Sequence, residues 1–99
     1  MTSLKGKTAL VTGASKGIGK AIALAFGEAG ANVVATGRNQ AEIFEVTATI
    51  STRGSNAIGV TADLGIESDI ADLANSAVKE FGGVDILVNN AGIIQPRIQ

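Results

Sequence analysis

The sequence predicts an α/β fold in which parallel strands alternate with helices, and three observations lead to this expectation. Short apolar runs recur along the 99 residues, and several of them end at a glycine. Longer segments lie between these runs, and their apolar residues repeat at the spacing of a helix. The connections are short, which favours parallel strands joined by right-handed crossovers.

Four apolar segments are predicted strands. The first is Thr8–Thr12, a continuous apolar run typical of a strand buried on both faces. The second is Asn32–Thr36, closed by Gly37, and the third is Ala57–Thr61. The fourth is Val84–Val88, which would be left as an open, apolar edge of the sheet.

The first predicted helix covers Ile18–Ala29 and ends before Gly30, a residue suited to a left-handed C-cap. The second covers Ala41–Arg53 and is rich in β-branched residues, which have lower helix propensity. It is followed by the helix-breaking segment 54–56. The residues expected on the buried faces are Ile18, Ala21, Ile22, Ala25, Phe26 and Ala29 in the first helix, and Ile43, Phe44, Val46 and Ile50 in the second.

The third predicted helix, Glu67–Phe81, has the clearest amphipathic pattern and stops at Gly82. Its expected buried face consists of Ile70, Leu73, Ala74, Ala77, Val78 and Phe81.

The composition excludes several classes of function. The chain contains no cysteine and no histidine, so we expect neither a disulfide framework nor a metal site. The net charge is −1 with both signs scattered, which does not suit nucleic-acid binding. No apolar stretch approaches the ~18 residues of a membrane span, and the N-terminus does not resemble a signal peptide. We therefore expect a cytoplasmic protein.

A glycine-rich loop joins the first strand to the first helix with the spacing G-x-x-x-G-x-G, formed by Gly13, Gly17 and Gly19. Glycines allow a tight turn and close approach of a ligand, and the amide groups at the helix start then face outward. Together with the helix dipole they bind a pyrophosphate. Such loops also turn corners for structural reasons alone, but the position between a buried strand and a helix favours binding. The prediction is a Rossmann-type doubly wound parallel sheet, truncated after its first four strands and three helices.

Three segments resemble motifs of the short-chain dehydrogenase/reductases. Thr12–Gly19 is similar to the T-G-x-x-x-G-x-G motif of that family, and Asn89–Gly92 is similar to its N-N-A-G motif. Asp63 and Leu64 are similar to the acidic pair that the family places at the adenine. The resemblance covers the whole chain, and its general pattern is similar to that of bacterial 3-oxoacyl-carrier-protein reductases and related sugar or secondary-alcohol dehydrogenases.

The resemblance implies a role for each of these residues. Ile18 and its neighbours offer backbone amides to the pyrophosphate, Asp63 accepts from the adenine amino group, and Leu64 packs against the ring. The alternative for Asp63 is a plain turn residue. Asn89 is expected to tie the fourth strand to its neighbours. The floor near the nicotinamide ribose is expected to consist of Asn90, Ala91 and Gly92.

Basic residues at the adenine ribose indicate NADP rather than NAD. NAD-binding Rossmann domains place a carboxylate after the second strand to accept from the ribose 2′-hydroxyl. Here that position holds Arg38, while Lys16 lies in the glycine loop and Ser15 adds a hydroxyl. Arginine grips a phosphate with a planar fork and lysine adds a point charge. The alternative is that both cations are solvated surface charges.

The family resemblance also implies that the catalytic residues are not among residues 1–99. Its members carry a Tyr-x-x-x-Lys pair, a Ser and a helix Asn downstream of N-N-A-G, and the chain has no tyrosine. We therefore name no catalytic residue, and we interpret residues 1–99 as the N-terminal portion of an NADP-binding Rossmann domain. The whole protein is expected to be an oxidoreductase acting on a carbonyl or alcohol substrate, as a dimer or tetramer. The alternatives are a non-catalytic dinucleotide-binding module and an inactive fragment.

Overall fold

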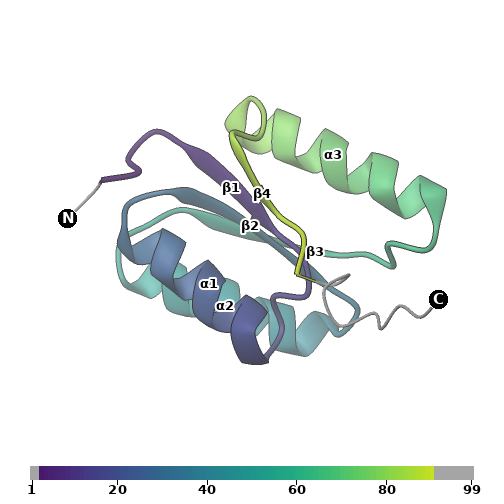
Figure 1. Ribbon diagram of the computed structural model, residues 1–99, viewed down its shortest axis with the longest axis horizontal. Coiled ribbons are helices and arrows are strands. Elements are labelled where there is room, and N and C mark those ends of the chain that lie inside the picture. Colours follow the sequence, from purple (N-terminus) through teal and green to yellow (C-terminus); the bar gives the residue numbers. More distant parts are fainter. Residues whose placement is uncertain (1–2, 91–99) are drawn as a thin grey trace, which may run out of the picture.

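A computed structural model describes residues 3–90 as a four-stranded parallel sheet with helices on both faces (Figure 1). The strand order is β3-β2-β1-β4, and each neighbouring pair is parallel. This is the predicted Rossmann-like arrangement. In chain order the elements are β1 (Thr8–Val11), α1 (Gly17–Glu28), β2 (Asn32–Gly37), α2 (Gln40–Thr52), β3 (Ala57–Thr61), α3 (Glu67–Phe81) and β4 (Ile86–Val88).

The element boundaries agree with the predicted ones to within one residue, except at the fourth strand, which begins at Ile86 rather than at Val84. Asp85 explains the difference. Its backbone N–H donates to the carbonyl of Thr8, while its carboxylate Oδ2 accepts from the Thr8 N–H, each at 2.9 Å. A side chain therefore replaces the main-chain acceptor at this pair, and the regular ladder starts one residue later.

Alternate residues of the strands point to opposite faces of the sheet, as the pleat of a strand requires. One face buries Val11, Val33 and Ala35 against residues of α1 and α2. The other face buries Leu10 and Val34 against α3. Figure 1 shows the resulting layers, with α1 and α2 on one side and α3 on the other. Because both faces are covered, β1 is buried along its whole length.

The buried face of α1 differs from the prediction. The residues buried in this helix are Gly19, Ala23 and Gly27, whereas Ile18 is 70% exposed. Ala21 and Ala25 are also exposed, and Ile22 and Phe26 pack beside the core as half-buried residues. Small side chains are needed because neighbouring elements approach α1 closely. A Cβ added to Gly27 would lie 2.8 Å from Cγ2 of Ile50 in α2.

The other two helices bury narrower faces than their patterns indicated. In α2, Phe44 was predicted to be buried but is 73% exposed, and Thr47 is buried instead. The Thr47 hydroxyl donates to the Phe44 carbonyl at 3.0 Å. In α3, Leu73 and Ala77 are buried, whereas Val78 is 59% exposed. The predictions for Ile70 and Ala74 are also wrong, because both are exposed, and Phe81 is half-buried. Among residues 3–90, no helix has the length and apolarity that crossing a membrane requires.

The reassigned face of α1 can be tested by paired substitutions. Ala23→Leu should lower the free energy of unfolding by about 1–3 kcal/mol, because the added carbons have no space in the closely packed interface. Ala25→Leu should change it by less than about 0.5 kcal/mol, because position 25 is exposed. Urea unfolding followed by circular dichroism measures both. Equal losses for the two variants would contradict the assigned face.

Candidate functional site at the carboxyl ends of the strands

The carboxyl ends of the parallel strands meet at one edge of the sheet, where doubly wound folds bind ligands. A cavity of about 670 Å³ lies at this edge, within the range of small-molecule sites. It is formed by the segments that follow β1, β2, β3 and β4. Its lining residues are Gly13, Ser15, Lys16, Ile18, Thr36, Gly37, Arg38, Asn39, Glu42, Ala62, Asp63, Leu64, Gly65 and Asn90.

The loop after β1 turns sharply over the end of β2. Gly13 and Gly17 have φ values of 60° and 61°, a left-handed conformation that residues with a side chain rarely adopt. Between them, the buried Ala14 donates its N–H to the Thr36 carbonyl at 3.0 Å. This bond anchors the loop to β2, so the loop forms one wall of the cavity.

Gly19 allows the loop to lie directly on the first turn of α1. A Cβ at this position would fall inside contact distance of the Gly13 carbonyl oxygen, and 2.7 Å from Nδ2 of Asn90. Asn90 Nδ2 donates to that same carbonyl at 3.3 Å. Asn90, in the segment after β4, therefore holds the glycine loop through this bond. The contact is possible because Gly19 has no side chain.

The N-terminus of α1 is arranged to receive an anion. Its N-cap, Lys16, makes no side-chain capping bond. The described first turn of α1 contains no acidic residue. In α2, by contrast, Asn39 caps the helix by accepting from the Glu42 N–H at 3.0 Å. Because the first amides of a helix have no acceptor within it, the first turn of α1 offers donors to a ligand.

Both cations predicted at the adenine ribose line the cavity. Arg38 follows β2 directly and is exposed. Lys16 extends its ammonium to 4.0 Å from the Glu42 carboxylate, with side-chain exposures of 79% and 39%. A bridge this open contributes little to stability, so the lysine can exchange partners at small cost.

A tight turn after β3 holds Asp63. Its Oδ1 accepts from the Gly65 N–H, and its own N–H donates to the Asp69 carboxylate, each at 2.9 Å. A carboxylate accepts several hydrogen bonds, so the second oxygen of Asp63 retains acceptor capacity. Leu64 lines the cavity and also packs beside the core residues under α3.

The structure brings most of the predicted residues together. Eight are among those that line the cavity, namely Gly13, Ser15, Lys16, Ile18, Arg38, Asp63, Leu64 and Asn90. Gly17 and Gly19 shape the loop without lining it, and Ala91 and Gly92 lie outside the described residues. Asn89 accepts from the Thr12 hydroxyl at 3.3 Å, which ties the end of β4 to β1 as expected of a structural residue.

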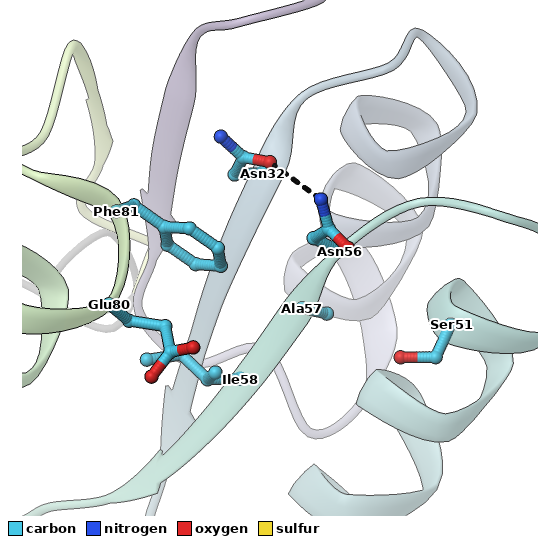
Figure 2. A pocket seen from close by; sticks show the side chains of 7 residues that line it. All are labelled: Asn32, Ser51, Asn56, Ala57, Ile58, Glu80 and Phe81. Atoms are coloured by element: carbon cyan, nitrogen blue, oxygen red, sulfur yellow. Dashed lines mark hydrogen bonds between the residues drawn. The ribbon is translucent and has the colours of Figure 1, made fainter.

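A second hollow, of about 570 Å³, lies near the start of β3 and the ends of α2 and α3 (Figure 2). Asn56 donates there to the Asn32 side-chain oxygen at 3.3 Å, and Glu80 contributes a carboxylate. Its lining, within the described chain, includes no lysine or arginine. This hollow does not suit a phosphate, whereas the cavity at the carboxyl edge combines the N-terminus of α1 with Lys16 and Arg38.

Sequence reasoning missed two polar residues at the start of α2 that line the cavity, Asn39 and Glu42. Their spacing is that of a helix N-cap and the acidic residue three positions later, a recognisable start signal. That signal would have placed Asn39 at the N-cap and Glu42 in the first turn of α2, directly after Arg38 in the sequence.

Comparison with known proteins identifies the family. The family model for short chain dehydrogenases matches residues 7–99. The chain belongs to the short-chain dehydrogenase family. This agrees with the three motifs and with the strand order. A closer resemblance to 3-oxoacyl-carrier-protein reductases stays a prediction.

Short-chain dehydrogenases of several kinds are similar to this chain. Versicolorin reductase stcU of Emericella nidulans is 48% identical over 92 residues, which are 92% of this chain and 35% of that protein. A metagenomic short-chain oxidoreductase solved with NADP superposes with a TM-score of 0.86 at 42% identity, covering 93% of this chain and 42% of that one.

A third relative is L-sorbose reductase from Gluconobacter frateurii, solved with NADPH and L-sorbose. The reductase superposes with a TM-score of 0.86 at 33% identity, and the match covers 96% of this chain and 39% of the reductase chain. The chain thus spans about a third of the length of the first curated relatives that it matches.

The contact between the glycine loop and α1 generates a prediction. Gly19→Ala should lower the free energy of unfolding by about 1–3 kcal/mol, because the new methyl group forces the Gly13 carbonyl and Asn90 to move. Ile18→Ala serves as the control, since Ile18 is 70% exposed, and should cost less than about 0.5 kcal/mol. Thermal unfolding measures both. A Gly19→Ala variant as stable as the parent would contradict the described contact.

Proposed function

We propose that this chain is the cofactor-binding part of an NADP(H)-dependent oxidoreductase, and that residues 1–99 form the N-terminal portion of its Rossmann domain. One observation carries the proposal: a single cavity combines the uncapped N-terminus of α1 with the side chains of Lys16 and Arg38. Helix amides suit a pyrophosphate, and the two cations suit a further phosphate.

The residues present fit a dinucleotide. Gly13 in the loop after β1 lines the cavity, and so does Ile18 in the first turn of α1. Asp63 offers a carboxylate oxygen to the adenine amino group, and Leu64 offers an apolar surface to the ring. Asn90, with Ala91 and Gly92 beyond the described residues, would form the floor near the nicotinamide ribose.

The cations favour NADP over NAD. After β2 the chain continues with Arg38, where an NAD-binding domain would place a carboxylate. A 2′-phosphate carries roughly two negative charges, by analogy with phosphorylated side chains, and a charged hydrogen bond is worth about 1.5–3 kcal/mol. Two of the similar structures hold NADP or NADPH, which supports the same preference.

The chemistry proposed for the whole protein is hydride transfer. Bound NADP(H) supplies or accepts the hydride exchanged with a carbonyl or a secondary alcohol, while the residues described here bind and orient it. The general acid and base lie, by the family resemblance, in a Tyr-x-x-x-Lys pair outside this sequence. A cytoplasmic location, a small-molecule substrate and a homo-oligomeric assembly complete the proposal.

Arg38 is the sharpest test of the cofactor assignment. Arg38→Asp should weaken NADPH binding by roughly tenfold to a hundredfold, because it replaces a charged donor with a repelling carboxylate. The preference should shift toward NADH, whose 2′-hydroxyl the new carboxylate can accept from. Isothermal titration of the 99-residue chain with NADPH and NADH measures both affinities.

Arg53→Asp is the matched control, because Arg53 is another exposed arginine and pairs with Glu28 at 3.4 Å, outside the cavity. This variant should keep the parent preference. Unchanged NADPH affinity in Arg38→Asp would contradict the assignment of Arg38. If the parent chain bound neither dinucleotide, the inactive-fragment alternative would replace the proposal for this chain.

A further inference from the structure

Glu42 places a negative charge inside the cavity that is proposed to receive phosphates. Its backbone is held by the Asn39 cap in the first turn of α2, so it reaches the same edge of the sheet as Arg38. Its carboxylate lies 4.0 Å from the Lys16 ammonium. One of the two cations assigned to the 2′-phosphate thus already has an anionic partner.

We propose that Glu42 is a specificity-determining residue that limits the preference for NADP(H) over NAD(H). Its carboxylate competes with the 2′-phosphate for Lys16, and it repels that phosphate directly. A dinucleotide with a 2′-hydroxyl brings no such charge to this part of the cavity and escapes both effects. The inference rests on the proposed function, because it takes the cavity to be the adenine-ribose site.

Exposure decides the size of this effect. The bridge is largely open to water, where two unit charges 4 Å apart interact by only about the equivalent of a fivefold change in an equilibrium constant. Lys16 can therefore exchange Glu42 for a phosphate. Because the ion pair with Glu42 is lost in that exchange, the net gain in NADPH affinity is smaller. Glu42 should therefore lower the affinity for NADPH moderately without preventing binding.

The chain contains a matched control one helical turn away. Lys20 of α1 and Glu45 of α2 form a second ion pair at 3.8 Å, between the same two helices. Neither residue lines the cavity. Neutralising Glu45 changes the net charge and the contact between α1 and α2 as neutralising Glu42 does, but away from the ligand.

The test compares Glu42→Gln with Glu45→Gln in the 99-residue chain. Isothermal titration with NADPH and NADH at low and high salt gives the dissociation constants, and urea unfolding checks the fold. Glu42→Gln should bind NADPH about three- to tenfold more tightly and NADH within about twofold of the parent, with the NADPH gain shrinking at high salt. Glu45→Gln should leave both constants within about twofold.

The possible failures are distinct. Unchanged or weaker NADPH binding by Glu42→Gln would overturn the role of Glu42 while the proposed function stands. An equal gain in Glu45→Gln would also overturn it, because the effect would then be one of net charge. If the parent chain bound neither NADPH nor NADH, the proposed function itself would fail.

Discussion

The close contact between the Gly13 carbonyl and the first turn of α1 constrains the whole carboxyl edge of this molecule. It requires a hydrogen in place of a side chain at Gly19, because a Cβ would fall on the carbonyl and within 2.7 Å of Asn90 Nδ2. Once this contact forms, the start of α1 has a fixed position relative to β1 and to the segment after β4. The open amides, the loop and Asn90 then face one cavity. The family's glycine spacing is thus a requirement of packing as much as of ligand binding.

The fold was predictable because the strands are short apolar runs and the helices end at recognisable residues. Gly30 has a φ of 96°, the left-handed conformation expected just after α1. The faces of the helices were harder to predict, because large apolar residues were assumed to mark the buried side. In α1 the opposite holds. The loop after β1 leaves no room for a Cβ at Gly19, and Ile50 of α2 leaves none at Gly27, whereas the larger Ile18 is exposed.

The candidate site was predictable where it depends on strand order and not where it depends on contacts between helices. Parallel strands bring their carboxyl ends to one edge, so the residues after β1, β2 and β3 meet whatever the details of packing. The start signal of α2 indicates that Glu42 lies in the first turn of that helix, but its place beside Lys16 follows from how α1 lies against α2. That placement matters for the proposed function because it puts opposite charges around the proposed phosphate position. The balance of Arg38, Lys16 and Glu42, rather than any one of them, sets the preference in this account.

Titration of the isotopically labelled 99-residue chain with 2′,5′-ADP, followed by amide NMR shifts, shows whether the cavity at the carboxyl edge binds the adenine ribose and its 2′-phosphate. This probe carries the adenine, the ribose and both phosphates that the described residues are proposed to hold. We expect saturable shifts at the loop after β1, at Arg38 and at Asp63, with smaller shifts for 5′-AMP. Shifts centred on Asn56 and Phe81, in the hollow near the start of β3, would show that the nucleotide binds elsewhere. Equal responses to the two nucleotides would show that the cavity does not recognise the 2′-phosphate.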